Sequence, residues 1–424
     1  MLTAITRYGV RVPPHTDEII ERCHSRGEVT DGPLIVEFER ALEQRFGSGT
    51  AIATCYGRMA FFHILRALDL PAGSEIIVPA LTFWVIPELA RQAGLRPVFA
   101  DVNADTFTLD PDAFERAITP NTRAVVPTHL YGLPCDMDPI MNIARRHNLA
   151  VIEDCAHALG ATYRGQSVGT FGDGALFSFQ TIKPLNAFGG GMALVKDPEI
   201  ARRVREQVDP LPWPGPKRIE NRFKVAKAQR FFGRNGVFTV TAFPILWATS
   251  WFDWNPDVYL WEKIQPLKPL KPEYLERFPN IQAALGLDGL TRLDEWTRAT
   301  QAHAHAIDRV LSQTPGIQTP VAPSDRTHVY YQYCAYVPDR DDLVKRCIRR
   351  GVDIETLHVD VCPQLPLFAD LSPAPAPNAE RASEAVQVPV YASLTERQVD
   401  RVANTVRRAV EHHVRPGRAA TARS

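Results

Sequence analysis

Residues 151–196 read VIEDCAHALGATYRGQSVGTFGDGALFSFQTIKPLNAFGGGMALVK, and the rest of the chain is interpreted outward from them. Three short apolar runs lie in this stretch, at 151–154, 174–179 and 192–195. Short apolar runs bounded by glycine are typical of buried strands in an α/β sheet. Ligands of such sheets bind at the strand ends. We therefore expect the polar residues that follow these runs to form a site.

Two of those polar residues have the chemistry of one cofactor. Asp154 ends the first run, and Lys183 follows the second. Pyridoxal phosphate (PLP) needs a lysine that holds it covalently and an anion that keeps its ring nitrogen protonated. The pair therefore suggests a PLP site, although spacing alone also allows Asp154 to be a strand-end cap and Lys183 a solvated loop lysine.

The same stretch resembles the DegT/DnrJ/EryC1/StrS family of sugar aminotransferases, whose pattern reads approximately EDxAQ/HxxG…GxxGDxxxFSFxxxK…GGxxxxxD. The matching positions are Glu153, Asp154, Ala156, His157, Gly160, Gly169, Gly172, Asp173, Phe177, Ser178, Phe179, Lys183, Gly190, Gly191 and Asp197. The resemblance implies an α/β chain of the aspartate-aminotransferase type (PLP fold type I). Its large domain would hold a mostly parallel central sheet, and a smaller α/β domain would follow at the C-terminus. Strands at 51–54, 75–79, 96–101 and 123–127, alternating with helical stretches, agree with this fold.

The resemblance also implies roles for individual residues. Lys183 would hold PLP and move the proton between substrate and cofactor, Asp154 would pair with the ring nitrogen, and His157 would contact the 3-oxygen. The cofactor-binding residues would be Gly57, Arg58, Phe83, Asp154, His157, Ser178 and Lys183. Among them, Phe83 would stack on the ring, while Ser178 and the turn at Gly57–Arg58 would bind the phosphate at a helix N-terminus.

Two positions depart from the family pattern. Arg58 stands where the family has threonine, and a guanidinium can also bind phosphate. Leu275 stands where the family has an asparagine that reaches the cofactor phosphate of a neighbouring subunit, although Arg277 is kept. The cross-subunit contact is therefore in doubt, and Arg58 is a candidate to compensate for it.

Composition restricts the alternatives. The chain has 424 residues with 48 basic and 48 acidic side chains, which argues against nucleic acid as the main partner. Its seven cysteines form no CxxC pair, so we expect reduced thiols and no metal site. The N-terminus lacks the apolar region of a signal peptide, which predicts a cytoplasmic protein, possibly peripheral to the membrane.

We divide the chain into an N-terminal arm (1–35), a large PLP-binding domain (36–204), an atypical insertion (205–270), a helix returning to the large domain (271–300), a small domain (301–413) and a disordered tail (414–424). A single helix is expected from Leu287 to Leu311, a strand from His328, and an amphipathic helix at 394–412. His358 lies near the expected mouth of the site. The uncharged run 236–252 allows three interpretations: a lid over the substrate, an oligomer contact, or a membrane-surface patch.

The expected function is transfer of an amino group from L-glutamate or L-glutamine to a keto sugar, either nucleotide-linked or a cyclitol, in polysaccharide, glycolipid or antibiotic biosynthesis. The family resemblance further implies a homodimer. Two alternatives stay open. A PLP-dependent sugar dehydratase is disfavoured by Lys183, because relatives with that activity carry histidine there. A non-catalytic PLP-binding regulator is favoured by the altered residues at 58 and 275.

Overall fold

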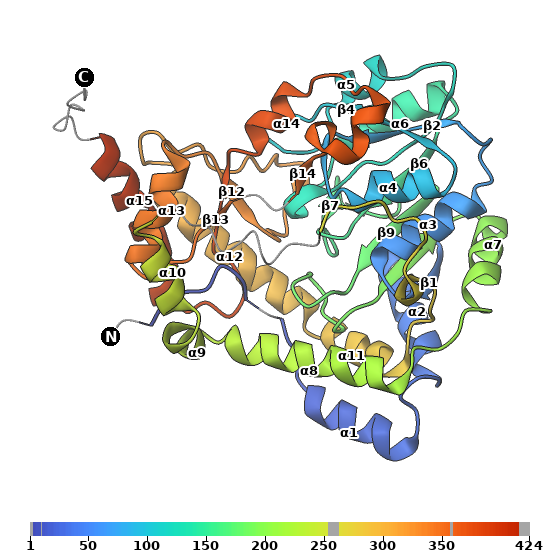
Figure 1. Cartoon of the computed structure of the whole chain (residues 1–424), viewed down its shortest axis with the longest axis horizontal. Helices are drawn as coiled ribbons and strands as arrows, with labels where there is room; N and C mark the ends of the chain where they lie inside the picture. The colour runs from blue at the N-terminus through green and yellow to red at the C-terminus, as the bar shows by residue number, and fades with distance from the viewer. Residues whose placement is uncertain (1–2, 10, 253–262, 357–358, 415–424) are drawn as a thin grey trace.

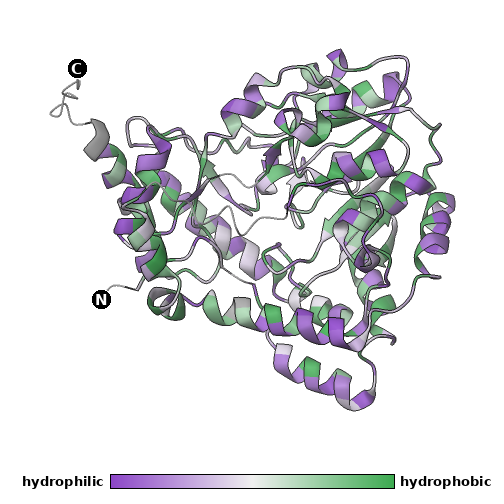
Figure 2. Ribbon diagram, in the orientation of Figure 1, coloured by the Kyte–Doolittle hydropathy of each residue, from purple (hydrophilic) through white to green (hydrophobic). Residues whose placement is uncertain are grey.

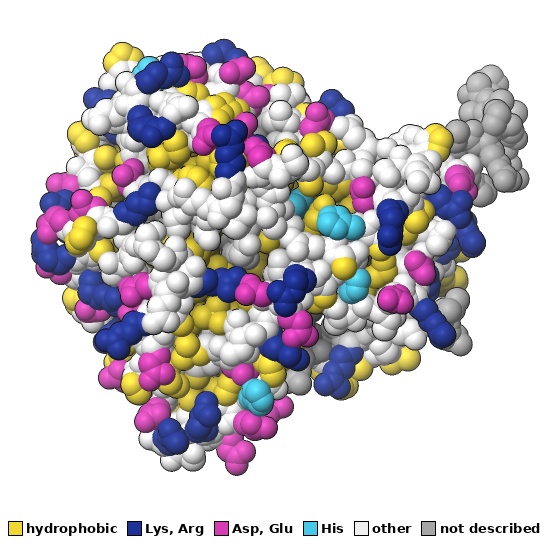
Figure 3. Space-filling model, turned by 180° about the vertical axis from the view of Figure 1, so that it is seen from behind, with side chains coloured by type: hydrophobic (Ala, Val, Ile, Leu, Met, Phe, Trp, Pro, Cys, Tyr) yellow, Lys and Arg dark blue, Asp and Glu magenta, His cyan; other side chains and the backbone are white. Residues whose placement is uncertain are grey.

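The computed structural model describes residues 3–9, 11–252, 263–356 and 359–414. His358 and almost all of the tail predicted to be disordered lie outside these residues. The chain is built around one large sheet and one small sheet, which lie on the right and the left of Figure 1. Basic and acidic side chains are interspersed over the face shown in Figure 3, as their equal numbers in the sequence lead one to expect.

The large sheet has seven strands in the order β1-β10-β9-β6-β5-β2-β4. Their bounds are β1 Thr50–Thr54, β2 Glu75–Pro79, β4 Arg96–Ala100, β5 Thr122–Val125, β6 Ala150–Asp154, β9 Gly174–Ser178 and β10 Gly191–Val195. Only β10 runs antiparallel to its neighbours. The predicted mostly parallel sheet is therefore confirmed, and each of its strands overlaps a predicted one.

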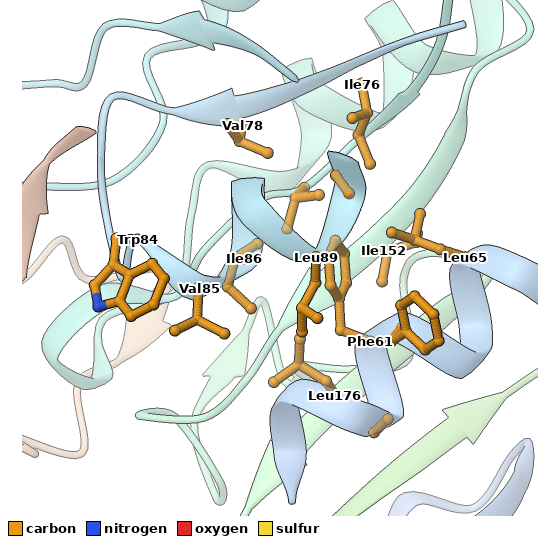
Figure 4. Close-up of a cluster of buried hydrophobic side chains, with 14 of the residues drawn as sticks. Phe61, Leu65, Ile76, Val78, Trp84, Val85, Ile86, Leu89, Ile152 and Leu176 are labelled. Carbon is orange, nitrogen blue, oxygen red and sulfur yellow. The ribbon is translucent and has the colours of Figure 1, made fainter. Parts of the chain in front are cut away.

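Buried apolar residues on both sides of the strands hold the large sheet between helices. Figure 4 shows Ile76, Val78 and Ile152 packed with Phe61 of α3 (Gly57–Ala67) and Leu89 of α4 (Val85–Gln92). Neighbouring strand residues point to the opposite face, because successive side chains of a strand alternate. There the sheet packs on α2 (Leu34–Phe46), α5 (Pro111–Arg116), α6 (Met137–Arg146) and α11 (Asn280–Leu290). The sheet is thus covered on both faces, as expected of parallel strands.

The small sheet joins β12 (Tyr333–Ala335), β15 (Val386–Val388) and β13 (Glu355–Thr356). Helices α12 (Leu293–Leu311), α13 (Arg340–Arg349) and α15 (Glu396–Val414) pack around it. The predicted amphipathic helix at 394–412 is confirmed as α15. Its buried face carries Val399, Val402, Val406 and Val410.

Two predictions in this region are wrong. The single helix expected from Leu287 to Leu311 is two helices, α11 and α12, which are separated at Thr291. The Thr291 hydroxyl donates to the Asp288 carbonyl oxygen (2.6 Å), and such local bonds compete with helix continuation. The strand expected from His328 begins only at Tyr333, because Tyr330 has a φ of 48°, outside the strand region.

The segment read as an insertion is mostly helical. Helix α7 (Pro198–Val208) still packs on α3, and it is followed by α8 (Pro216–Phe232), α9 (Asn235–Val240) and α10 (Phe243–Thr249). In Figure 1, α8 runs horizontally above α1, and α9 leads from its end to α10, which lies beside α13. Hydrophilic and hydrophobic residues mix along α8, whereas α9 is mainly hydrophobic (Figure 2). Among the described residues, no helix has the length and apolarity needed to span a membrane.

The remaining elements are short or peripheral. They are α1 (Thr16–Arg26), α14 (Pro377–Ala382), β3 (Leu81–Thr82) paired with β14 (Asp360–Val361), and a sheet of β11 (Arg326–Thr327), β7 (Thr162–Tyr163) and β8 (Gln166–Ser167).

Candidate active site

The predicted site residues lie at one edge of the large sheet. All strands except β10 run in one direction, so their carboxyl ends share that edge. There β6 ends at Asp154, β9 ends at Ser178, and β1 leads through a short turn to α3 at Gly57. The carboxyl edge of an open α/β sheet is where ligands bind. The fold therefore brings Asp154, Ser178 and Gly57 together.

The Asp154 side chain is 6% exposed, and its Oδ1 accepts a hydrogen bond from the Ala156 N–H (3.0 Å). Burial raises the pKa of Asp154, while the Ala156 N–H and the Lys183 ammonium oppose that rise. A buried carboxylate with an unused oxygen is suited to pair with a cation, such as a protonated ring nitrogen.

The Lys183 amine faces the same space from the loop after β9. Its Nζ lies 4.9 Å from the centre of the Tyr331 ring. Burial lowers the pKa of Lys183 to about 8, against the opposing effect of the Asp154 carboxylate and with help from the Arg58 cation. At pH 7 about one-tenth of such amines are neutral, far more than for a solvated lysine. The amine is thus suited to nucleophilic attack and proton transfer.

His157 packs against two tyrosines beside this amine. Its ring stacks on Tyr331 with 4.1 Å between centroids, and its Nδ1 accepts from the Tyr131 N–H (3.3 Å). Because Nδ1 is the acceptor, a neutral ring carries its proton on Nε2. Burial lowers the pKa of His157 well below its usual value, and the Lys183 cation lowers it further. The neutral ring therefore offers one N–H donor.

Glu153, next to Asp154, serves a structural purpose. One carboxylate oxygen accepts from the N–H groups of Phe171 and Gly172 (both 2.8 Å), and the other accepts from Gly169 N–H (2.7 Å) and from His129 Nε2 (3.0 Å). His129 Nδ1 is occupied by a further backbone N–H, so neither ring nitrogen has a lone pair for a cation. The buried group His129, Glu153 and Cys155 therefore orders the loop between β6 and β9 and has no free nitrogen ligand.

The first turn of α3 lies directly against the end of β9. A Cβ on Gly57 would lie 2.7 Å from the Phe177 carbonyl oxygen and 3.0 Å from the Ser178 Cβ, so only glycine fits. The first N–H groups of a helix have no intrahelical partner and favour anions. Gly57 and Ser178 thus border a ready site for a phosphate.

Arg58 projects from this turn into a cage of aromatic rings. Its guanidinium donates to the Tyr274 hydroxyl (2.6 Å) and lies 5.2 Å from the centre of the Phe83 ring. The Tyr56 and Tyr274 rings lie at 5.7 and 5.3 Å from it. Arg58 therefore shares the surroundings of Phe83, the ring predicted to stack on the cofactor, and places a cation beside the first turn of α3.

A second arginine, which the sequence did not single out, approaches the same turn from α8. Arg222 donates to the Tyr56 hydroxyl (3.0 Å) and to Gln282 Oε1 (3.1 Å), and its guanidinium lies 5.2 Å from the centre of the Tyr56 ring. Its two partners are neutral, so they leave its charge uncompensated. Arg222 was not singled out because it lies in the segment 205–270, which the sequence analysis read as an atypical insertion.

Leu275, which departs from the family pattern, and Arg277, which is kept, lie close to Tyr274 in the sequence. Leu275 is 38% exposed, whereas its neighbour Tyr274 is buried and holds Arg58. Arg277 stacks on Trp213, with 3.9 Å between its guanidinium and the ring centre. Tyr274, which lies next to Leu275, thus supplies a contact to Arg58.

The donor set fits PLP. The buried carboxylate matches the ring nitrogen of PLP, and the amine of lowered pKa matches its aldehyde. The helix N-terminus, flanked by two arginines, matches its phosphate. These features belong to one edge of one sheet. The fold and this edge define a PLP-dependent aminotransferase of fold type I.

The sequence profile of the DegT/DnrJ/EryC1/StrS aminotransferase family matches residues 14–239 and 259–407, and the chain belongs to this family. It is 32% identical over 401 residues to the GDP-perosamine synthase of Caulobacter vibrioides, which covers 91% of this chain and 92% of that protein. It is also 32% identical over 419 residues to the UDP-N-acetyl-3-dehydro-alpha-D-glucosamine 3-aminotransferase of Acidithiobacillus ferrooxidans, covering 96% and 98% of the two chains.

Among solved structures, the fold resembles that of DesI in the presence of its TDP-sugar product. The TM-score is 0.74 at 26% identity, and 97% of this chain and 94% of that chain are covered. Together these relatives make the chain an enzyme of the sugar-aminotransferase type, and they imply PLP as its cofactor.

Proposed function

We propose that this enzyme transfers an amino group from L-glutamate or L-glutamine to the keto group of a nucleotide-linked sugar. The observation that carries the proposal is the Lys183 amine, with its pKa near 8, beside the buried Asp154 carboxylate. The relatives named for GDP-, UDP- and TDP-linked sugars support a nucleotide-linked acceptor over a free cyclitol.

Bound PLP supplies an aldehyde that carries the amino group and a ring that accepts electrons. Lys183 would hold the cofactor through its Nζ and, once displaced by the donor, act as the base that moves a proton at the substrate carbon. That role requires a neutral amine near pH 7, which burial provides. Asp154 would hold a proton on the ring nitrogen, and His157 would donate from Nε2 to the 3-oxygen.

The phosphate would bind where α3 begins. Gly57 and Ser178 border that point, and Arg58 would add a cation to it. Besides Gly57, Ser178 and Arg58, we assign a fourth contact with the phosphate to Arg222, which reaches the same turn from α8 of the same chain. A phosphate there would give Arg222 an anionic partner, which the Tyr56 hydroxyl and the Gln282 amide do not provide. The proposal also includes a homodimer located in the cytoplasm.

An absorbance titration tests the function. The purified enzyme with PLP should show the visible band of lysine-bound PLP, and L-glutamate or L-glutamine should remove it. A nucleotide-linked keto sugar should then restore the band and yield an amino sugar detectable by mass spectrometry. A band that no amino donor changes would mean that the chain binds PLP without transferring amino groups, and sedimentation velocity would show whether the species is a dimer.

A further inference from the structure

Helix α10 exposes an apolar surface that the enzyme chemistry does not use. Its seven residues read FPILWAT, and none of them is buried. The exposed side chains of this surface are Val240 (74%), Ile245 (58%), Trp247 (44%), Trp251 (57%) and Phe252 (71%), here called the aromatic patch. The family profile does not match residues 240–258, which include the aromatic patch. Contiguous apolar surface of this kind marks a site of interaction.

The patch is attached to the small-domain side, away from Lys183. Asn235 Oδ1 accepts from the Thr6 N–H (3.1 Å), and Thr239 Oγ1 accepts from the Ala4 N–H (2.8 Å). Arg349 of α13 lies 4.0 Å from the centre of the Trp251 ring. These contacts hold α9 and α10 beside the N-terminal arm and α13.

A groove of about 1020 Å³ separates the patch from α13 and α15. Phe243, Pro244 and Trp247 form its apolar wall, and four arginines and one carboxylate line the opposite side. Those charged residues are Arg349, Arg350, Arg401, Arg408 and Asp400. The groove therefore joins an apolar wall to a surplus of positive charge.

Within the described part of the chain, the hydrogen bonds of Arg350 and Arg401 do not neutralise the positive charge of the groove. Arg350 donates to the Arg346 carbonyl oxygen (3.2 Å), and Arg401 donates to those of Thr3 (2.5 Å) and Arg350 (2.8 Å). Carbonyl oxygens satisfy the N–H groups but do not neutralise the charge. The groove thus complements an anion whose other end is apolar.

We propose that the aromatic patch and the groove arginines dock this enzyme on an anionic phospholipid surface. Apolar aromatic side chains beside arginines suit the boundary between acyl chains and phosphate headgroups. The described helices lie on such a surface and do not cross it. The docking does not depend on PLP or on the proposed reaction.

Vesicle co-sedimentation of the full-length enzyme tests this inference. The enzyme should bind vesicles of phosphatidylcholine mixed with phosphatidylglycerol, bind pure phosphatidylcholine weakly, and be released by salt. Arg350→Ser with Arg408→Ser should weaken binding to the mixed vesicles about 30-fold, and Trp247→Ser with Phe252→Ser should weaken it at least as much. The double variant Arg123→Ser with Arg145→Ser is the control for the groove arginines, and Val321→Ser is the control for the aromatic patch. These residues lie outside the patch and groove, so both controls should bind as the native enzyme does.

Light scattering during size exclusion separates this docking from self-association. All variants should keep the native mass and melting temperature. The lipid assignment is wrong if the native enzyme binds neither kind of vesicle, or if the patch and groove variants bind the mixed vesicles as tightly as the native enzyme does. It is equally wrong if Trp247→Ser with Phe252→Ser lowers the mass, because the patch would then be a contact between two copies of this chain.

Discussion

Asp154 and Lys183 are both buried close enough for their charges to interact, and each reduces the cost of burying the other. Burial lowers the pKa of Lys183 to about 8 although Asp154 raises it, and burial raises the pKa of Asp154 although Lys183 lowers it. The pair therefore links the reactivity of the amine to the charge of the carboxylate, and this link can be measured.

The rate at which the cofactor-free enzyme captures PLP should increase with pH and level off above about pH 8. Only the neutral amine attacks the aldehyde, and Lys183 becomes neutral as the pH rises through its pKa. Asp154→Asn removes the charge that raises this pKa, so the midpoint should move to lower pH. The exposed Asp294→Asn is the control. A midpoint that stays in place or moves to higher pH in Asp154→Asn would contradict the pairing.

Lys183→Ala should reduce turnover by about 10³-fold or more, because a general base and the covalent anchor are both lost. The fold should remain intact by circular dichroism. In the cofactor-free enzyme, Lys183→Met should not lower stability at pH 7. The pKa of about 8 in the folded state lies below the ordinary lysine pKa of 10.5, so the folded state holds the ammonium less well, and stability rises with pH between these values. Retained turnover in Lys183→Ala would refute the assignment.

Arg222→Ala should weaken PLP binding by about 10- to 100-fold, because it removes a charge-assisted bond to phosphate. Binding of pyridoxal, which lacks the phosphate, should change less than about twofold. The two affinities are measured by absorbance titration of the cofactor-free enzyme. Lys224→Ala, an exposed residue of the same helix paired with Glu220, is the control. Equal losses for PLP and pyridoxal would show that Arg222 only supports Tyr56 and Gln282.

Glu153→Gln should destabilise the protein by about 2–4 kcal/mol in urea unfolding. Glu153 accepts from three backbone N–H groups and from His129, whereas glutamine has one accepting oxygen and would direct an NH₂ group at other donors. Glu115→Gln, which loses only an exposed pair with Arg146, should cost less than about 1 kcal/mol. Similar losses in the two variants would mean that Glu153 does not hold the loop.

The sheet was predictable because its strands are apolar and end at glycine or at a polar residue. Runs such as 75–79 and 151–154 are buried on both faces of the sheet. Strands in that environment are recognisable in the sequence as nearly continuous apolar runs. The break between α11 and α12 was not predictable in the same way. It depends on a threonine bonding to a nearby carbonyl oxygen within an otherwise helical pattern.

The site was predictable where residues follow strands, as at Asp154 and Ser178. Arg222 was missed because its approach to Tyr56 depends on how α8 crosses the sheet edge, and crossing geometry has no local sequence signal. The aromatic patch was visible as an uncharged run. Its position beside α13 and α15, on which the lipid proposal depends, came only from the fold.

The close approach of Gly191 to Gly57 fixes the main chain at the start of α3, independently of the side chains around it. A Cβ on Gly191 would lie 2.2 Å from the Gly57 nitrogen, so main chain meets main chain where α3 begins. No side chain lies between the two glycines, so the main-chain amides at the start of α3 keep their position whatever residues surround the sugar substrate. Side chains in the walls of the pocket can therefore change without moving the main-chain amides at the start of α3.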